Sequence, residues 1–248
     1  MDLTDGTINN ESLVTDLVTK DYRVSDIFRK YNISYCCGGK IALQAACELH
    51  NVDIAILKKE LTDAMRVIQI SSAVDFNKWN VDFLVDYIIN IHHAYLHINL
   101  PGTRNTLAIF LKGHQSKYPY INELINCFDL LCGEIIPHLE YEEKVIFPYI
   151  KQIVHAWENH ESYAGLLVRT LRKPVEAMIK QEQDNIEEYL YRFRKLTNNY
   201  IPPAGACITH KVALSKLKEL DGDLVQHIYL ENEILFPRAI QVEKELKK

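Results

Sequence analysis

Two histidine–glutamate pairs in the sequence have the same spacing and could bind a metal ion. His138 and Glu142 form the first pair, and His227 and Glu231 form the second. Residues four apart lie on one face of a helix, so each pair can direct an imidazole and a carboxylate toward one point. The pairs open the related segments HLEYEEKVIFPYI and HIYLENEILFPRAI. This duplication predicts a metal site to which two helices contribute.

Apolar residues at helical spacing surround both pairs. The first stripe contains Leu131, Ile135, Val145 and Tyr149, and the second contains Leu220, Leu224 and Ile234. An ionised glutamate in such surroundings is destabilised by several kcal/mol unless it is paired or binds a metal. The alternative is an ordinary pair on a solvent-facing helix surface, which contributes only roughly 0.2–0.5 kcal/mol. The stripes and the repeat favour the metal site.

Two more histidines, His93 and His160, lie on apolar stripes of other predicted helices. One such histidine alone is usually a core residue satisfied by a hydrogen bond. Together with the pairs, they predict one inward histidine from each of four helices. Four imidazoles and two carboxylates exceed the usual ligand set of one zinc ion, so two metal ions fit better, and the imidazole share favours iron. His92 and His97 are weaker candidates, and His97 is expected at the surface or around the ligands.

The periodicity of the chain is helical almost throughout. Apolar residues recur at three- and four-residue spacing, which predicts an all-α fold. A four-helix bundle is expected from long helices at residues 80–100, 119–152, 157–195 and 209–245. Pro101-Gly102 is expected to end the first helix, which leaves His114 beyond a break, either gating the site or exposed. Pro148 and Pro237 either kink their helices or mark the last turns.

The beginning of the chain predicts a separate small helical domain. Its helices are expected at residues 24–31, 41–49 and 51–65, with Asn51 capping the third. Residues 70–79 lose the periodicity and are expected to form a linker. The predicted organisation is a small domain at 1–69, the linker at 70–79 and the bundle at 80–248.

Cys36 and Cys37 are adjacent in the segment SYCCGGK of the small domain. On a flexible turn, two thiols could bind a soft metal ion, become oxidised or attack a disulfide. The alternative is that they are small buried hydrophobic residues, although two adjacent side chains cannot both face one core. The other cysteines are expected to be core or incidental residues: Cys47, Cys127, Cys132 and Cys207.

Composition restricts the partners and the location. The net charge is −5 and the basic residues are scattered among acids, which argues against a nucleic-acid partner. No apolar segment is long enough to span a bilayer, so no membrane partner is expected. The N-terminal segment lacks the basic flank and apolar core of a secretory signal. A cytoplasmic location with reduced cysteines is therefore expected, and association into a homodimer is left open.

The chain resembles the repair-of-iron-centres family over nearly its whole length. IFRKYNISYCCGGK resembles the family's N-terminal cysteine-containing domain, and HLEYEEKVIFP and HIYLENEILFPRA resemble its two ligand helices. The resemblance implies a hemerythrin-like bundle that holds two non-haem iron ions with an oxo or hydroxo bridge. The ligands that it implies are His93, His138, Glu142, His160, His227 and Glu231. The run AYLHIN after the first ligand departs from the family's basic, histidine-containing pattern.

The resemblance also implies an arrangement of the ligands. One iron would be held by His93 and His227 and the other by His138 and His160, with Glu142 and Glu231 bridging. Cys36 and Cys37 would act as relay ligands for iron.

The function that the resemblance implies is the repair of iron–sulfur clusters damaged by nitrosative or oxidative stress. Iron would be donated to, or exchanged with, damaged or apo iron–sulfur proteins. An alternative is a di-iron enzyme or sensor that binds or reduces nitric oxide or dioxygen, and a further one is a bundle that is zinc-stabilised or metal-free. The sequence does not decide whether the protein is an enzyme.

Overall fold

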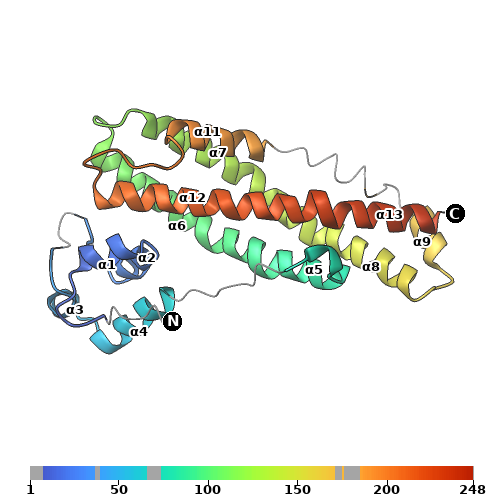
Figure 1. Ribbon diagram of the computed structural model, residues 1–248, viewed down its shortest axis with the longest axis horizontal. Coiled ribbons are helices and arrows are strands. Elements are labelled where there is room, and N and C mark those ends of the chain that lie inside the picture. The colour runs from blue at the N-terminus through green and yellow to red at the C-terminus, as the bar shows by residue number, and fades with distance from the viewer. Residues whose placement is uncertain (1–7, 37–39, 66–73, 171–174, 176–184, 248) are drawn as a thin grey trace.

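The computed structural model describes residues 8–36, 40–65, 74–170, 175 and 185–247. These residues are mainly helical, and a single bridge between Leu13 and Ala42 is the one strand-like pairing among them. The prediction of an all-α helical bundle is confirmed (Figure 1). Within the described ranges, no helix has both the length and the apolar character needed to cross a membrane.

Three long helical rods make up most of the bundle, and a wider π-helical turn interrupts each of them. The first rod consists of α5 (Val81–Tyr87), η2 (Ile88–His93) and α6 (Ala94–His114). The second consists of α7 (Tyr120–Tyr141), η3 (Glu142–Ile146) and α8 (Phe147–Glu158). The third consists of α12 (Ile208–Tyr229), η4 (Leu230–Leu235) and α13 (Phe236–Leu246). The fourth position is shared by α9 (Ala164–Thr170), against α8 and α13, and α11 (Ile186–Leu196), against α7.

The expected helix end at Pro101-Gly102 is wrong. The helix α6 continues through both residues to His114. Leu100 and Leu107, on either side of the proline, are buried in the core. Burial of these side chains offsets the one backbone hydrogen bond that a proline removes.

The expected helix at 157–195 is wrong in its first part. The helix α8 ends at Glu158, and His160 follows in a turn with a φ of 51°. A positive φ is incompatible with a right-handed helix, so the chain must leave the rod at this point. The middle of the expected helix, at 171–174 and 176–184, lies outside the described residues.

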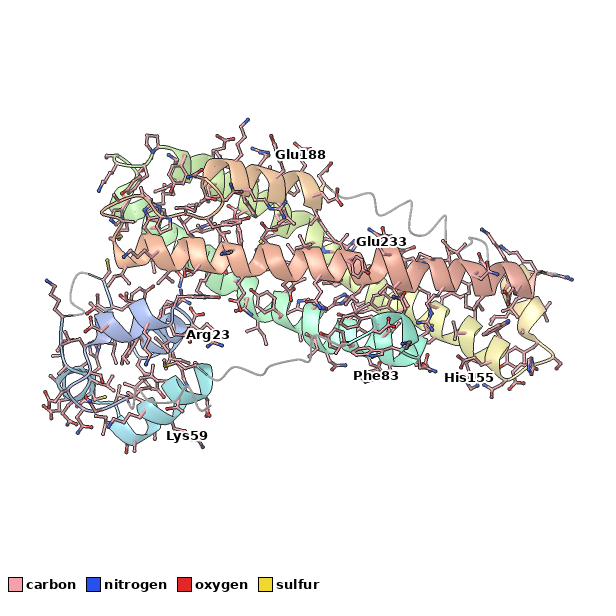
Figure 2. The ribbon with its side chains drawn as sticks, in the orientation of Figure 1. Arg23, Lys59, Phe83, His155, Glu188 and Glu233 are labelled. Atoms are coloured by element: carbon pink, nitrogen blue, oxygen red, sulfur yellow. The ribbon has the colours of Figure 1, made fainter. Side chains whose placement is uncertain are left out.

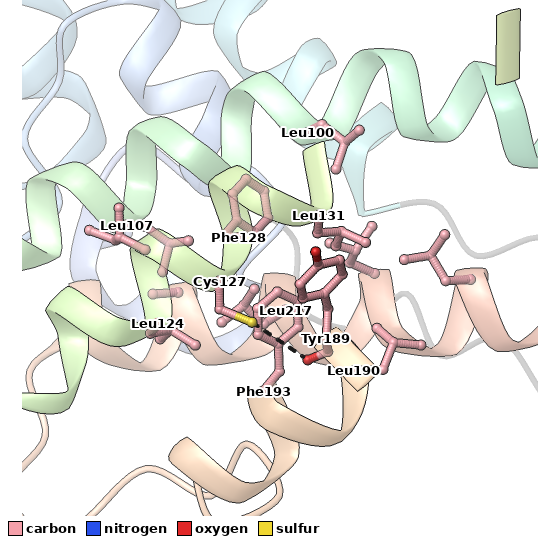
Figure 3. Packing of buried hydrophobic residues seen from close by; sticks show 14 of the residues in the cluster. Leu100, Leu107, Leu124, Cys127, Phe128, Leu131, Tyr189, Leu190, Phe193 and Leu217 are labelled. Atoms are coloured by element: carbon pink, nitrogen blue, oxygen red, sulfur yellow. Dashed lines mark hydrogen bonds between the residues drawn. The ribbon is translucent and has the colours of Figure 1, made fainter. Parts of the chain in front are cut away.

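Two apolar clusters fill the bundle, while Phe83, His155 and Glu188 lie on its outer surface (Figure 2). The first cluster joins α6, α7, α11 and α12, and in it the thiol of Cys127 donates to the carbonyl of Tyr189 at 3.9 Å (Figure 3). The second cluster joins α5, α8 and α13 with the three π-helical turns. Each rod therefore passes from one cluster to the other close to its π-helical turn.

The N-terminal unit consists of four short helices around its own apolar cluster. They are α1 (Val14–Lys20), α2 (Val24–Lys30), α3 (Leu43–His50) and α4 (Ile54–Ala64). Phe28, Leu43 and Leu57 are fully buried in this cluster. Asn51 does not cap α4 as expected, because it ends α3 in the left-handed conformation. Asp53 is the cap, and its side chain accepts hydrogen bonds from two backbone N–H groups of α4.

The predicted division of the chain at residues 69 and 80 stays a prediction. Residues 70–73 of the expected linker lie outside the described residues, and η1 (Phe76–Lys78) forms one 3₁₀ turn in the remainder. The N-terminal unit lies beside the half of the bundle in which α12 begins (Figure 1).

The N-terminal unit contacts the bundle through both apolar and polar side chains. Val212 of α12 is buried in the apolar cluster of the unit. Asp26 of α2 pairs with Lys216 of α12. Arg29 of α2 donates to the carbonyl of Gly102 at 3.3 Å and to the hydroxyl of Thr106 at 3.0 Å. These contacts place the end of α2 against α6 and α12.

Candidate metal centre

Two histidines and two glutamates converge in the bundle. They are His93 at the end of η2, Glu142 at the start of η3, His227 in α12 and Glu231 in η4. One ligand atom of each lies within 4.8 Å of the others. All four side chains are buried, with exposed fractions of 2% or less. Segments far apart in the sequence thus present their donor atoms to one point.

The two histidine nitrogens are spaced as neighbouring ligands of one metal ion. His93 Nε2 and His227 Nε2 are 3.1 Å apart. Metal–nitrogen bonds of about 2.1 Å at right angles place two donor atoms roughly 3 Å apart. Glu231 Oε1 lies 2.7 Å from His227 Nε2. These three residues can therefore hold a single ion.

Glu142 connects this group to a fifth residue, His138. Glu142 Oε2 lies 3.2 Å from His138 Nε2 and 3.5 Å from His93 Nε2, so the carboxylate reaches from one imidazole to the other. Neither oxygen of Glu142 has a hydrogen-bond partner among the residues that the structure describes. A buried carboxylate in this state is destabilised by several kcal/mol unless a cation compensates it. The donor set therefore fits a bound metal ion.

The charges within the group are balanced against one another. Burial alone would lower the pKa of His93, but Glu142 and Glu231 outweigh this effect and raise it to about 9. Burial alone would raise the pKa of Glu231, but His227, His93 and His138 together lower it. In the metal-free protein a protonated imidazole therefore supplies positive charge that the carboxylates require. A divalent ion that binds here would replace that proton.

Carboxylates outside the group orient the histidines. Glu143 Oε1 lies 2.8 Å from His93 Nδ1, which leaves Nε2 facing the group. Asp223 Oδ1 lies 2.9 Å from Nδ1 of the buried His92, whose ring is stacked parallel to that of His227 at 5.7 Å. Neither Glu143 nor Asp223 is among the residues expected from the sequence. Asp223 precedes His227 by four residues, so the same helical spacing could have found it.

The π-helical turns carry ligand candidates in all three rods. His93 ends η2, Glu142 begins η3, and Glu231 lies in η4. A π-helical turn inserts one extra residue into a helix and changes the direction of the side chains around it, often at functional sites. The local backbone thus helps to direct the three side chains toward one another.

Pro148 and Pro237 occupy equivalent positions directly after two of these turns. Each is the second residue of the following helix, α8 or α13. A proline ring clashes with the carbonyl four residues earlier, which here belongs to the π-helical turn. The wider turn accommodates that clash, so the prolines lie within continuing rods and mark neither of their last turns.

Two family models match the chain. Residues 85–239 match the hemerythrin HHE cation binding domain, and residues 10–65 match ScdA_N, a domain of unknown function. The iron-sulfur cluster repair protein YtfE of Shigella boydii is 31% identical over 218 residues, which cover 88% of this chain and 91% of the relative. YtfE of an Enterobacter strain is 31% identical over 225 residues, which cover 91% and 94%. A probable iron-sulfur cluster repair protein of Haemophilus influenzae is 29% identical over 214 residues, which cover 86% and 90%.

The chain belongs to the iron–sulfur cluster repair family. The resemblance found in the sequence is thereby confirmed. As in the matched domain model, the bundle of this family member is a cation-binding domain of the hemerythrin type. The five converging residues all lie within the matched range, and they are the place in this domain where a metal ion fits.

The sixth ligand that the family resemblance implied, His160, is not brought to the group. It is exposed in the turn after α8. Because α8 leads away from Glu142, the helix rise places His160 roughly 25 Å further along the rod. The structure of this family member therefore assembles five of the six implied ligands.

The cysteines implied as relay ligands do not adjoin the group either. The thiol of Cys36 lies next to that of Cys207. Cys207 caps the N-terminus of α12, about 30 Å along that helix from His227. Cys37 lies outside the described residues. The described position of Cys36 is too distant for it to take iron directly from the five residues.

The remaining candidate histidines are also placed. His114 is half-buried at the end of α6, about 30 Å along the helix from His93, so it does not gate the site. His97 is half exposed, and its Nε2 lies 4.0 Å from Glu143 Oε1. It adjoins the carboxylate that orients His93, as expected for a residue around the ligands.

Proposed function

We propose that this chain is a di-iron protein that repairs iron–sulfur clusters damaged by nitrosative or oxidative stress, by donating or exchanging iron. The observation that carries this proposal is the buried carboxylate of Glu142, which spans two imidazoles without a hydrogen-bond partner among the described residues. The names of the relatives give the cluster-repair activity, and damaged iron–sulfur proteins are the partners that follow from it. The proposed location is the cytoplasm.

Each iron has its own ligands in this proposal. His93, His227 and Glu231 hold one ion, and His138 holds the other, with Glu142 shared between them. Imidazole and carboxylate donors suit iron. The second ion has fewer protein ligands among the described residues than the first, so it is the one that the protein gives up.

The exposure of the ligands indicates a side for iron exchange. The side chain of His138 is 13% exposed, whereas the side chains of the other four ligands are 3% exposed or less. Iron held by His138 therefore has the shortest path to solvent and to a partner. Glu143 keeps the ring of His93 fixed, which retains the more enclosed ion.

Iron transfer to an apo iron–sulfur protein tests the proposal. The chain is loaded anaerobically with ferrous iron, and iron per chain and cluster formation in the acceptor are measured. Glu142→Leu with Glu231→Leu is expected to abolish both. The matched control, Glu140→Leu with Glu233→Leu, changes two exposed glutamates nearby and should abolish neither.

The alternative function is an enzyme or sensor that binds or reduces nitric oxide or dioxygen. The same loaded protein distinguishes the two functions. Steady turnover of nitric oxide with an electron donor, without iron transfer to the acceptor, would favour the alternative. Full iron retention by the double glutamate variant would contradict the metal site itself.

A further inference from the structure

Two cysteines from different parts of the chain meet where the N-terminal unit contacts the bundle. Cys36 follows α2, and Cys207 caps α12, where its sulfur accepts a hydrogen bond from the backbone N–H of His210 at 3.4 Å. Cys36 lines one cavity with Thr209 of the first turn of α12, which places its thiol next to that of Cys207. Both residues are partly exposed and present as thiols. Docking of the N-terminal unit thus brings together two thiols that are remote in sequence.

A cavity of about 230 Å³ leads to Cys36. Arg29 and Ser34 of the N-terminal unit line it, together with Ile109 of α6 and Thr209 of α12. Ser34 and Ile109 are exposed, so the cavity communicates with solvent. Its volume is several times the roughly 30 Å³ that one water molecule occupies, so part of a small organic molecule can enter.

The two thiols differ in access. Cys36 lines the cavity, whereas Cys207 is not among the residues that line it. Burial raises the pKa of Cys207, although backbone hydrogen bonds at the start of α12 oppose this in part. Cys36 is therefore suited to react first with a molecule in the cavity, and Cys207 to react second.

We propose that Cys36 and Cys207 form a disulfide when the protein meets a small disulfide such as oxidised glutathione. The Cys36 thiolate attacks one sulfur of the small disulfide, forming a mixed disulfide and releasing one small thiol. Cys207 then loses its proton, attacks the Cys36 sulfur and releases the second small thiol. Two protein thiols are oxidised to one disulfide, and the small disulfide is reduced to two thiols.

The disulfide would lock the N-terminal unit onto the bundle. The contacts that now hold the unit are all non-covalent: Val212 of α12 packs in the unit's apolar cluster, and Asp26 pairs with Lys216. A covalent link would add a constraint that these contacts do not supply. Because Cys207 is about 30 Å along α12 from His227, the thiol pair is a site separate from the metal group.

Peptide mapping of the oxidised chain tests this proposal. The purified full chain is incubated with oxidised glutathione, its remaining thiols are blocked, and it is digested with trypsin without reduction. Cleavage places Cys36 and Cys37 in peptide 31–40 and Cys207 in peptide 196–211. The two peptides are expected to be joined in the wild type and in Cys37→Ser, and separate in Cys36→Ser and Cys207→Ser. Serine is a favoured helix cap, so Cys207→Ser should fold.

Cys132→Ser provides the matched control, since Cys132 is a partly exposed thiol on α7. It should leave the joined peptides unchanged. A disulfide confined to peptide 31–40, between Cys36 and Cys37, would overturn the proposal. So would a link from peptide 31–40 to Cys132, or recovery of Cys36 and Cys207 only as blocked thiols or glutathione adducts.

Discussion

Single atoms decide which nitrogen of each histidine is available to a metal ion. The carboxylate of Glu143 lies 2.8 Å from His93 Nδ1, so Nδ1 carries the hydrogen and Nε2 is left as the donor to the metal. Such a partner also makes the imidazole a stronger ligand. The carboxylate next to a ligand residue is thus part of the site although it does not touch the ion.

Glu143→Ala is expected to weaken iron binding by about 10- to 100-fold, because His93 loses the partner that fixes its ring. Competition with a chelator of known affinity measures the change. Glu143→Gln, whose amide oxygen still accepts the hydrogen bond, should fall between the wild type and the alanine variant. Glu140→Ala removes an exposed glutamate of the same rod and serves as the control. Equal affinity of Glu143→Ala and Glu140→Ala would show that Glu143 has no such role.

Much of the candidate site follows from residue spacing alone. The two His-x-x-x-Glu pairs and His93 lie on apolar stripes, and the structure brings these five residues together. His160 also lies on an apolar stripe, but the stripe is interrupted because α8 ends at Glu158. Glu143 contacts a histidine on another rod, and a contact between rods leaves no periodic signal within either segment.

At the scale of elements, the first rod begins with a side-chain cap. Asn80 precedes α5, and its side chain accepts a hydrogen bond from the backbone N–H of Asp82 at 2.7 Å. The rod then continues through η2 to His93, so the start of α5 sets the position of a ligand candidate.

Asn80→Ala is expected to lower the free energy of unfolding of the metal-free chain by about 1 kcal/mol, because one N–H group of α5 loses its acceptor. Urea unfolding followed by circular dichroism measures the loss. Asn80→Ser, which can still accept the hydrogen bond, should recover most of it. If the alanine and serine variants are equally stable, the cap does not contribute as described.

The helices are predictable from the sequence where apolar residues recur at a regular helical spacing. They are less predictable where a helix-breaking residue stands between side chains that are buried in the core. Pro101 looks like a helix end, yet buried neighbours on both sides keep α6 intact. The π-helical turns are harder to predict, since one extra residue barely changes an apolar period read over a whole rod. A proline shortly after η3 and η4 indicates in the sequence where these two π-helical turns lie. No such residue marks η2, which is followed directly by Ala94.

At the scale of the whole molecule, a metal ion bound by Glu142 and Glu231 should stabilise the bundle. Iron bound to the folded state alone should add about 2.7 kcal/mol of stability at 100 times the dissociation constant. Glu142→Leu with Glu231→Leu is expected to abolish this gain. Without metal, the same variant should be at least as stable as the wild type, because apolar side chains replace buried charges. Thermal unfolding with and without iron measures both effects, and iron-dependent stabilisation of the variant would contradict them.

The far end of the bundle has a buried histidine whose titration should control acid stability. His210 is fully buried, its Nε2 lies 2.7 Å from the hydroxyl of Tyr120, and the ring of Phe110 covers it at 4.3 Å. Burial, with added repulsion from His114 and Lys117, lowers its pKa to about 4. The unfolded chain, with a histidine pKa near 6.5, binds the proton more readily than the folded chain.

Acidification should therefore favour the unfolded chain. The stability due to neutral His210 is complete above about pH 6.5 and decreases as the pH falls toward 4, by roughly 2 kcal/mol between pH 7 and pH 5. His210→Gln removes the titrating group. Between pH 7 and pH 5, the free energy of unfolding of the variant should therefore fall by roughly 2 kcal/mol less than that of the wild type. Urea unfolding of both metal-free proteins at the two pH values measures the difference. The pH-dependent contributions of carboxylates that both proteins contain cancel in this difference. Equal losses would mean that His210 is protonated in the folded state as readily as in the unfolded chain, and that its burial does not limit the stability of the bundle in acid.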